Sequence, residues 1–238
     1  MPRVPVTSLV DVLGPIVGAP SIVEHAADAT SRAADRVDPD HDVLALVAAG
    51  EVAAALRHLM HRHGKAVYRY CREALRDPAL ADDVHQQVFI QAFRDLPRFR
   101  GRSKLRTWLF AIARNRVLDA VKVRKRAQAH LDEADLLGVP DARPPVDHAL
   151  DDARLHAALI ASVADLGDDV RTTVLLRYQQ GFSFDEMGEI FGEKPGTLHA
   201  RVARAMPVLR AGIEARLGVA LRPALPPGAG ARTGGRPT

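Results

Sequence analysis

A basic stretch at residues 98–127, RFRGRSKLRTWLFAIARNRVLDAVKVRKRA, places the strongest constraint on how this chain can fold. It holds eleven Lys or Arg residues and one acid, Asp119, although the whole chain has a formal net charge of only +4. Apolar positions recur in it at three- and four-residue steps, the period of a helix: Leu105, Leu109, Ile112, the stem of Arg116, Val117, Ala120 and Val121. The pattern predicts a helix with one face in a core and arginines on the other. Such a helix faces phosphates or a membrane surface, or is an ordinary solvated face.

The composition favours an all-α protein with a polyanionic partner. Hydrophobic residues make up 47% of the chain and aromatic residues only 5%, so the core should be aliphatic and helical. The basic balance favours a polyanion as partner. Cys71 is the only cysteine, which excludes an intrachain disulfide and a thiolate metal cluster. No apolar run approaches the roughly 20 residues that span a bilayer. We therefore expect a soluble, cytoplasmic protein without membrane insertion.

The motif F-R-G-x-S-x-L-R-T-W-L-x-x-I-A-R-N-x-x-L-D at residues 99–119 is long and specific. It resembles the promoter-melting domain of bacterial sigma factors, in the extracytoplasmic-function (ECF) group. The upstream sequence ADDVHQQVFIQAF at residues 81–93 resembles the helix by which that group docks on RNA polymerase. The resemblance implies a protein that binds core RNA polymerase, recognises the −35 and −10 elements of promoter DNA and opens the duplex. An anti-sigma factor is a further candidate partner.

The chain is expected to have five segments. Residues 1–38 hold four prolines and do not match the family, so they should form a regulatory or disordered extension. Residues 39–127 should dock on polymerase and recognise the −10 element, and 128–153 should form an acidic linker broken by glycine and proline. Residues 154–218 should recognise the −35 element, and 219–238 should be a disordered tail. The expected fold is all-α, with two small helical domains joined by the flexible linker and a helix-turn-helix in the second.

The candidate polymerase-docking surface is polar and lies on the helix that follows Asp77-Pro78. Asp82 and Asp83 lie near the start of this helix, where acids also suit the positive end of the helix dipole. This is a purely structural explanation for these two residues. The resemblance implies contact with the clamp helices of the largest polymerase subunit, although the family usually has an acid where Gln87 stands. The four residues are Asp82, Asp83, Gln86 and Gln87.

The candidate −10 and melting site surrounds a loop at Gly101, which precedes the basic helix. In the family this loop captures an unstacked base of the non-template strand, while basic side chains hold its phosphates, as in other single-strand binding sites. Trp108 shares the apolar register with Leu105 and Leu109, so we expect it in the core rather than stacked on a base. The site residues that the resemblance implies are Arg100, Arg102, Ser103, Lys104, Arg106 and Asn115.

The candidate −35 site follows a turn at Gly192. Ser183 and Glu186 have the spacing of a capping box, and Pro195 suits the first turn of a recognition helix. Residues at the start of that helix should meet base edges and phosphates in the major groove. Pro207 should kink or end it. The site residues are Lys194, Thr197, His199, Ala200, Arg201 and Arg204.

Two other functions remain open at this point. A helix-turn-helix repressor or activator would bind duplex DNA without polymerase, but it would not need the docking face or the loop at Gly101. A nuclease could use His58, His61 and His63 with the basic helix. However, His63 turns away from the other two in a helix, so a solvated face is the favoured interpretation. We recognise no catalytic set, metal cluster or cofactor motif, and expect no enzyme, no metal and no cofactor.

Overall fold

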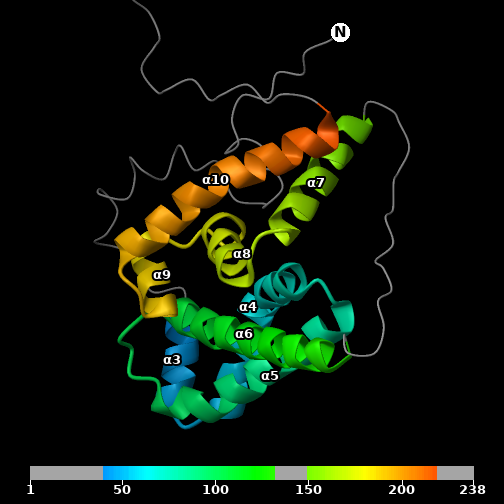
Figure 1. Cartoon of the computed structure of the whole chain (residues 1–238). Coiled ribbons are helices and arrows are strands. Elements are labelled where there is room, and N and C mark those ends of the chain that lie inside the picture. The colour runs from blue at the N-terminus through cyan, green and yellow to red at the C-terminus, as the bar shows by residue number, and fades with distance from the viewer. Residues whose placement is uncertain (1–39, 132–148, 219–238) are drawn as a thin grey trace, which may run out of the picture.

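A computed structural model describes residues 40–131 and 149–218, and every regular element in these two ranges is helical. The earlier range, drawn in blue to green, and the later range, in yellow-green to orange, form two groups of helices that lie against each other (Figure 1). The all-α prediction is confirmed. The expectations for residues 1–38 and 219–238 lie outside the described residues. No helix within the described ranges is long and apolar enough to cross a membrane.

The first group contains the basic stretch on its last helix. Its elements are α3 (His41–Ala48), α4 (Val52–Leu75), α5 (Pro78–Asp95), the 3-10 turn η1 (Leu96–Arg98) and α6 (Leu105–Leu131). α5 begins where the sequence predicts, because Asp77 accepts a hydrogen bond from the Leu80 amide at 3.1 Å and Pro78 occupies the first turn. The periodic apolar side chains of α6 point into the core, with Leu105, Leu109 and Val117 fully buried.

The second group ends in the long helix that carries the candidate −35 residues. Its elements are α7 (Ala149–Ala164), α8 (Asp168–Val174), the π-helical segment η2 (Leu175–Gln179), α9 (Phe184–Phe191) and α10 (Pro195–Leu217). Ser183 and Glu186 form the predicted capping box at the start of α9. Gly181 and Gly192 end their helical segments with φ of +72° and +67°, a backbone region in which glycine is favoured.

α10 continues through Pro207, so this proline does not end the helix, which was one of the two outcomes predicted for it. The helix runs to Leu217, although a proline inside a helix costs about 3 kcal/mol. Beyond it, Leu209 and Ile213 are fully buried, and burying each of these side chains stabilises the fold by about 1.5–3 kcal/mol. Ile213 packs on α7, and Gly212 lies so close to that helix that a Cβ would stand 2.9 Å from Ser162 Oγ. The burial of these two side chains therefore offsets the cost of the proline, and the helix continues beyond it.

Helices also occupy both ends of the segment expected to be a linker. The prediction placed it at residues 128–153, but α6 reaches Leu131 and α7 starts at Ala149. Each residue added to an existing helix forms a further backbone hydrogen bond, so helices extend beyond the residues that favour them most. The remaining acidic and proline-containing residues, 132–148, lie outside the described residues.

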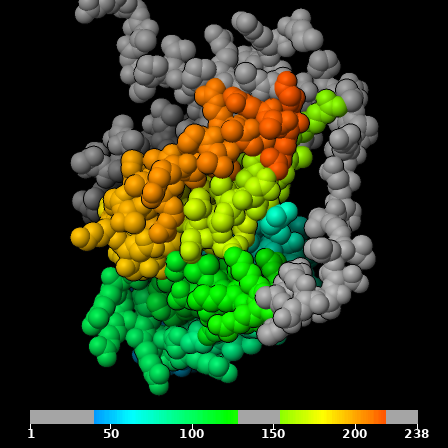
Figure 2. All heavy atoms as spheres, viewed as in Figure 1, coloured from blue at the N-terminus to red at the C-terminus, as the bar shows by residue number. Residues whose placement is uncertain are grey.

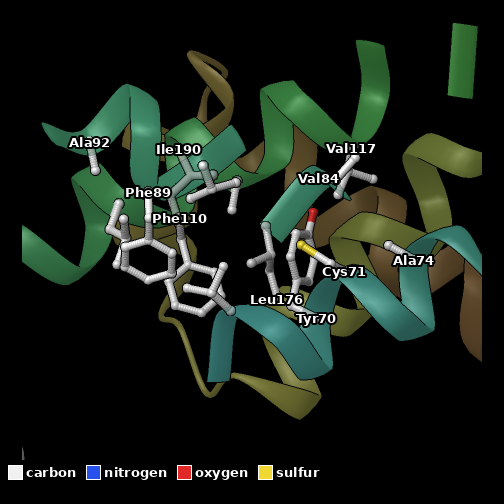
Figure 3. Packing of buried hydrophobic residues seen from close by; sticks show 14 of the residues in the cluster. Tyr70, Cys71, Ala74, Val84, Phe89, Ala92, Phe110, Val117, Leu176 and Ile190 are labelled. Atoms are coloured by element: carbon white, nitrogen blue, oxygen red, sulfur yellow. The ribbon is translucent and has the colours of Figure 1, made fainter. Parts of the chain in front are cut away.

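One hydrophobic core runs through both groups of helices, which the prediction of two separate domains did not anticipate. Tyr70 of α4 and Phe110 of α6 lie in the same cluster as Leu176 and Ile190 of the second group (Figure 3). The Phe110 ring is 5.8 Å from that of Tyr70 and 5.0 Å from that of Phe182, both edge to face. Because these side chains leave water only when the two groups are in contact, each group stabilises the other.

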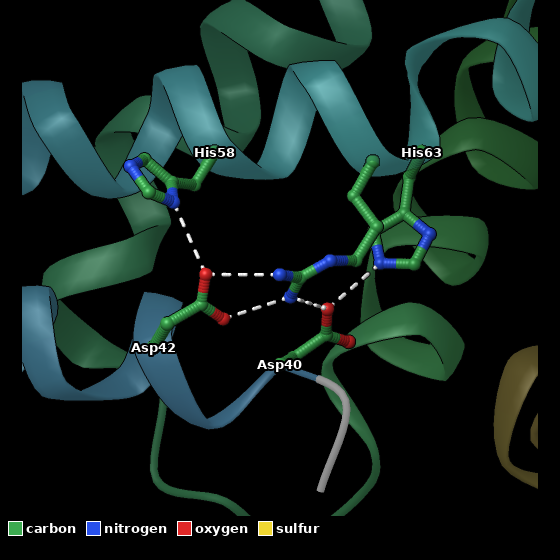
Figure 4. Close-up of polar contacts among 5 residues, drawn as sticks. Asp40, Asp42, His58 and His63 are labelled. Atoms are coloured by element: carbon green, nitrogen blue, oxygen red, sulfur yellow. Dashed lines mark hydrogen bonds and ion pairs between the residues drawn. The ribbon is translucent and has the colours of Figure 1, made fainter.

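Two of the three histidines on α4 have carboxylate partners, and His58 and His61 are exposed as expected of a solvated face, whereas His63 is not. His63 is buried, with Nε2 3.0 Å from Asp40, while the exposed His58 lies 3.1 Å from Asp42 (Figure 4). Arg62 bridges the two acids at 2.8 and 2.9 Å. Burial alone would raise the pKa of Asp40, but the hydrogen bonds from His63 and Arg62 outweigh it and lower that pKa. The network ties the start of α3 to α4.

The partners of these histidines lie 16 and 23 residues earlier in the chain, which is why helical spacing within α4 could not reveal them. Within the described ranges, no group of three or more His, Cys, Asp or Glu residues is arranged to hold a metal ion.

Candidate nucleic-acid and polymerase interfaces

The candidate docking face of α5 is open to solvent. All four of its predicted residues are exposed. Asp82 also has an intramolecular role, because its hydrogen bond with Tyr68 raises the pKa of that tyrosine. Buried Val84 and Val88 hold the opposite side of α5 in the core, so the polar face has a rigid support.

Two apolar side chains extend this face, and the sequence analysis missed them. Ile90 and Phe93 are each 44% exposed and follow Gln86 by four and seven residues, which places them on the same side of α5. Exposed apolar residues beside a polar face are typical of protein–protein contacts. The sequence could have revealed them, because neither Ile90 nor Phe93 falls at the helical spacing of the buried Val84 and Val88. The face thus offers both hydrogen-bonding groups and an apolar contact.

The loop before α6 contains Gly101 and three of the residues predicted for the −10 site. Gly101 has φ +66°, in the left-handed region, and lies in the bend between Phe99 and the helix. Arg100 and Arg102 are exposed, and Ser103 is half-buried. The Trp108 ring lies 5.3 Å from the Phe99 ring and packs against the core, as the apolar register predicts.

Lys104 and Arg106, the two basic residues that follow the loop, contact the second group of helices, although the Lys104 side chain stays 72% exposed. Lys104 Nζ lies 2.8 Å from the Glu186 carboxylate of α9. The guanidinium of Arg106 stands 4.0 Å from the centre of the Phe182 ring, and it donates a hydrogen bond to the Gln180 carbonyl. Burial lowers the pKa of Arg106. Both residues are therefore engaged by the second group of helices.

Asn115 stays exposed, roughly 15 Å further along α6 at 1.5 Å per residue. The structure therefore does not bring it close to the loop at Gly101. The exposed side of α6 between them belongs to one continuous helix, so a bound strand could run along it from the loop towards Asn115.

Further along α6, two more cations meet the second group, and the sequence analysis did not single them out. Arg114 stacks at 4.1 Å on the Phe191 ring, and its guanidinium is 4.0 Å from Asp169. Lys125 Nζ lies 2.5 Å from Asp168. The surface of α8 and α9 is pressed against that of α6 (Figure 2). Only the tertiary structure reveals these contacts, because their members lie far apart in the chain.

Most of the candidate −35 residues form an open surface at the start of α10. Lys194, Thr197, His199, Ala200 and Arg204 are exposed, and the His199 ring packs 5.1 Å from that of Phe184. Arg201 differs from them, because its guanidinium is 2.7 Å from the Glu193 carboxylate and is half-buried. Arg201 thus ties the turn to the helix, a role that the sequence analysis did not assign.

Comparison with known proteins identifies the family. Residues 59–127 match the model of sigma-70 region 2, a range that contains both the α5 face and the basic part of α6. The chain is 35% identical over 179 residues to the ECF RNA polymerase sigma factor SigC of Mycobacterium tuberculosis, covering 72% of this chain and 90% of SigC. It is 30% identical over 156 residues to the RNA polymerase sigma factor CarQ of Myxococcus xanthus, covering 66% of this chain and 87% of CarQ. The chain belongs to the ECF sigma factors.

Solved structures share the fold of this ECF sigma factor. One is the sigma factor RpoE in complex with the anti-sigma factor NepR from Bartonella quintana, with a TM-score of 0.53 and 22% identity over 66% of this chain and 96% of RpoE. Another is CnrH in complex with the cytosolic domain of CnrY, with a TM-score of 0.54 and 26% identity over 74% of this chain and 97% of CnrH. The resemblance found in the sequence is thus confirmed at the level of family and fold.

Proposed function

We propose that this ECF sigma factor binds core RNA polymerase through the exposed face of α5 and directs it to promoters. The observation that carries the proposal is the placement of this face and the basic loop of α6 on one rigid block of helices. A sigma factor must couple polymerase binding to strand opening, and a shared rigid support provides that coupling. A repressor or activator acting on duplex DNA alone has no use for the α5 face.

The α5 face would supply the contact with the clamp helices of the polymerase. Asp83, Gln86 and Gln87 offer hydrogen-bonding groups, while Ile90 and Phe93 offer apolar area that is desolvated on contact. Since Gln87 replaces the usual acid of the family, the contact relies less on charge here.

The loop and the start of α6 would bind the unpaired −10 strand. Arg100, Arg102, Lys104 and Arg106 would neutralise its phosphates, and the loop around Gly101 and Ser103 would hold a flipped base. Flipping costs a few kcal/mol of unstacking, which these contacts must offset. Asn115 would contact the junction of duplex and bubble.

The turn at Gly192 and the start of α10 would read the −35 duplex as a helix-turn-helix. Lys194, Thr197, His199, Ala200 and Arg204 line the surface that would enter the major groove. Arg201 reaches DNA in this proposal only by exchanging its ion pair with Glu193 for a contact to a base or phosphate.

The sigma factor contributes binding and strand separation rather than a catalytic group, because the polymerase carries out RNA synthesis. Its place of action is the cytoplasm, where bacterial chromosomal DNA is transcribed. Two solved relatives are complexes with protein partners, one of them an anti-sigma factor. We extend an anti-sigma partner to this chain as part of the proposal.

Run-off transcription tests the proposal. A promoter is first selected from a random duplex library with core polymerase and the full chain, and then transcribed with and without the protein. The triple alanine variant of Ser103, Lys104 and Asn115 should form closed complexes but lose permanganate reactivity of −10 thymines. A pre-melted bubble should partly restore its transcription. The Lys65→Ala variant, which removes an exposed cation on α4, serves as the control.

Two results would contradict the proposal. If the full chain never stimulates core polymerase, the sigma factor assignment of these surfaces fails. If the triple variant loses as much activity on the bubble as on the duplex, its residues bind only the DNA backbone. The salt dependence separates the two kinds of contact, with about 0.7 counterions released per single-strand phosphate and about 0.9 per duplex phosphate.

A further inference from the structure

A cavity of about 140 Å³ lies between α4 and the second group of helices, and the proposed function makes no use of it. α4 supplies one wall, and α7 and α8, which lie against α4, supply much of the rest together with η2 (Figure 1). None of the lining residues belongs to the α5 face, to the loop at Gly101 or to the start of α10. The cavity is therefore a separate feature of the molecule.

Most of the lining is aliphatic. It is formed by Leu159, Ile160, Val163, Val174 and Leu175, with the ring of Tyr178 beside them. Leu159 and Val174 are buried, whereas Ile160 is 39% exposed, which places Ile160 at the mouth. An engineered apolar cavity of about 150 Å³ binds benzene, so a space of this size accepts a body of about six carbon atoms. A branched aliphatic side chain fits it, and an indole ring exceeds it.

Two opposite charges on α4 border the aliphatic part without pairing with each other. Arg69 and Glu73 stand one turn apart, a spacing at which opposite charges on a helix can meet. Arg69 instead donates to the Gln179 carbonyl at 3.3 Å, which leaves most of its five N–H donors for another acceptor. The half-buried Glu73 has no hydrogen-bond or ion-pair partner among the residues that the structure describes. A carboxylate that is partly removed from water favours a cationic donor as its partner.

We propose that this cavity binds a free α-amino acid with a branched aliphatic side chain, such as leucine. The Glu73 carboxylate accepts hydrogen bonds from the α-ammonium group, and the Arg69 guanidinium donates to the α-carboxylate. The aliphatic side chain of the ligand fills the apolar part of the cavity. Only a zwitterion satisfies both charges, because a simple carboxylic acid leaves Glu73 without a partner and a simple amine leaves Arg69 without one.

Isothermal titration calorimetry of the full chain with leucine tests the site. We expect saturable binding of one leucine per chain, and a melting temperature that rises with leucine concentration, because a ligand that binds only the folded chain stabilises it. Tryptophan should not bind, since its ring exceeds the cavity. If leucine, isoleucine and valine all fail to show saturable binding at millimolar concentrations, the proposal is overturned.

Analogues of leucine separate the groups that are recognised. Isocaproate lacks the ammonium group and isoamylamine lacks the carboxylate, so each should bind the unaltered chain about tenfold or more weakly than leucine. N-acetyl-leucine amide lacks both charges and represents a leucine within a protein, so it should bind more weakly still. Isocaproate or isoamylamine binding as tightly as leucine would rule out a zwitterion site. Tight binding of the amide would instead mean that the cavity receives a side chain of a partner protein.

Two substitutions assign each contact to its residue. Glu73→Gln should weaken leucine binding by about tenfold, but leave the affinity for isocaproate unchanged or higher, because isocaproate has no ammonium group. Arg69→Gln should weaken leucine binding similarly and leave the affinity for isoamylamine unchanged or higher. A merely structural role of either residue would weaken all these ligands alike, and that result would overturn the assignment.

Lys65→Gln is the matched control for Arg69→Gln. It removes an exposed cation one turn earlier on α4, outside the cavity, and should leave leucine affinity unchanged. Equal losses in the two variants would mean that net charge, not contact, controls binding, and would also overturn the proposal. Circular dichroism and the ligand-free melting temperature check that each variant is folded, and the analogue series on the unaltered chain decides the question if one is not. None of these measurements involves polymerase or DNA, so their outcome is independent of the proposed function.

Discussion

Replacing Arg171 by alanine should destabilise the whole protein, although this residue lies on none of the proposed surfaces. Its side chain is only 6% exposed. The guanidinium donates to the Ala74 carbonyl of α4 at 3.1 Å, and to the Ala164 and Leu166 carbonyls at 2.9 and 3.0 Å. It also pairs with Asp168. Arg171 thus joins the end of α4 to the start of the second group.

The size of the loss in folding free energy follows from the hydrogen bonds that the backbone carbonyl oxygens lose. The residue four places after Ala74 is Pro78, which has no N–H, so helix α4 offers that carbonyl no other donor. Leaving a buried acceptor unpaired costs about 1–3 kcal/mol. Ala164 keeps a weaker bond from Arg76 at 3.4 Å, and Asp168 keeps Lys125. Two orphaned carbonyls give an expected loss of about 2–6 kcal/mol, a large part of the usual 5–15 kcal/mol of folding free energy.

Urea unfolding measured in parallel by circular dichroism and by the fluorescence of Trp108 provides the assay. Trp108, the only tryptophan, lies in the first group, so a shift of its transition in an Arg171 variant reports coupling through the shared core. Arg177→Ala is the matched control, because Arg177 donates to the Phe182 carbonyl at 2.8 Å within the second group and is only half-buried. It should cost about 1 kcal/mol. If Arg171→Ala costs no more than this control, or if the Trp108 transition does not move, the reasoning is refuted.

Four further substitutions test the proposed surfaces and the core. Asp83→Arg should weaken binding to core polymerase without changing circular dichroism, and unchanged affinity in a pull-down titration would argue against the α5 face. Arg204→Ala should lower −35-dependent binding by about 1–3 kcal/mol if it contacts a base. Arg201→Ala should instead lower thermal stability by releasing Glu193, and a loss of base preference would show that Arg201 changes partners on DNA. The Tyr70 hydroxyl is buried with no hydrogen-bond partner among the described residues, so Tyr70→Phe should leave the melting temperature unchanged or raise it. A clear drop would reveal a partner such as a buried water.

Local sequence signals predicted most of the elements, because their physical cause lies within a few residues. The capping box at Ser183 and Glu186, the left-handed glycines and the proline at the start of α10 each act on neighbouring backbone groups. The apolar period of α6 likewise needs only the geometry of one helix. The family motif supplied the candidate surfaces, and the structure places the α5 face, the loop and the start of α10 where a bound partner can reach most of their residues.

Contacts between residues far apart in the chain decided the rest. Pro207 was expected to kink or end α10, but the helix continues, because the burial of Leu209 and Ile213 against other helices outweighs the lost hydrogen bond. His63 was expected on a solvated face, but Asp40 reaches it from the preceding helix. In both cases the deciding partner lies outside the window in which helical spacing carries information.

By itself the sequence determined an all-α chain of the ECF sigma factor family, with a basic helix suited to a nucleic-acid strand. It could not determine that Lys104 and Arg106 contact the second group of helices. Glu186 lies 82 residues after Lys104, and the Gln180 carbonyl lies 74 residues after Arg106. No periodicity or motif encodes such distances, since they depend on how two groups of helices close over one shared core. That packing is a property of the tertiary structure alone, and it decides which partners Lys104 and Arg106 have.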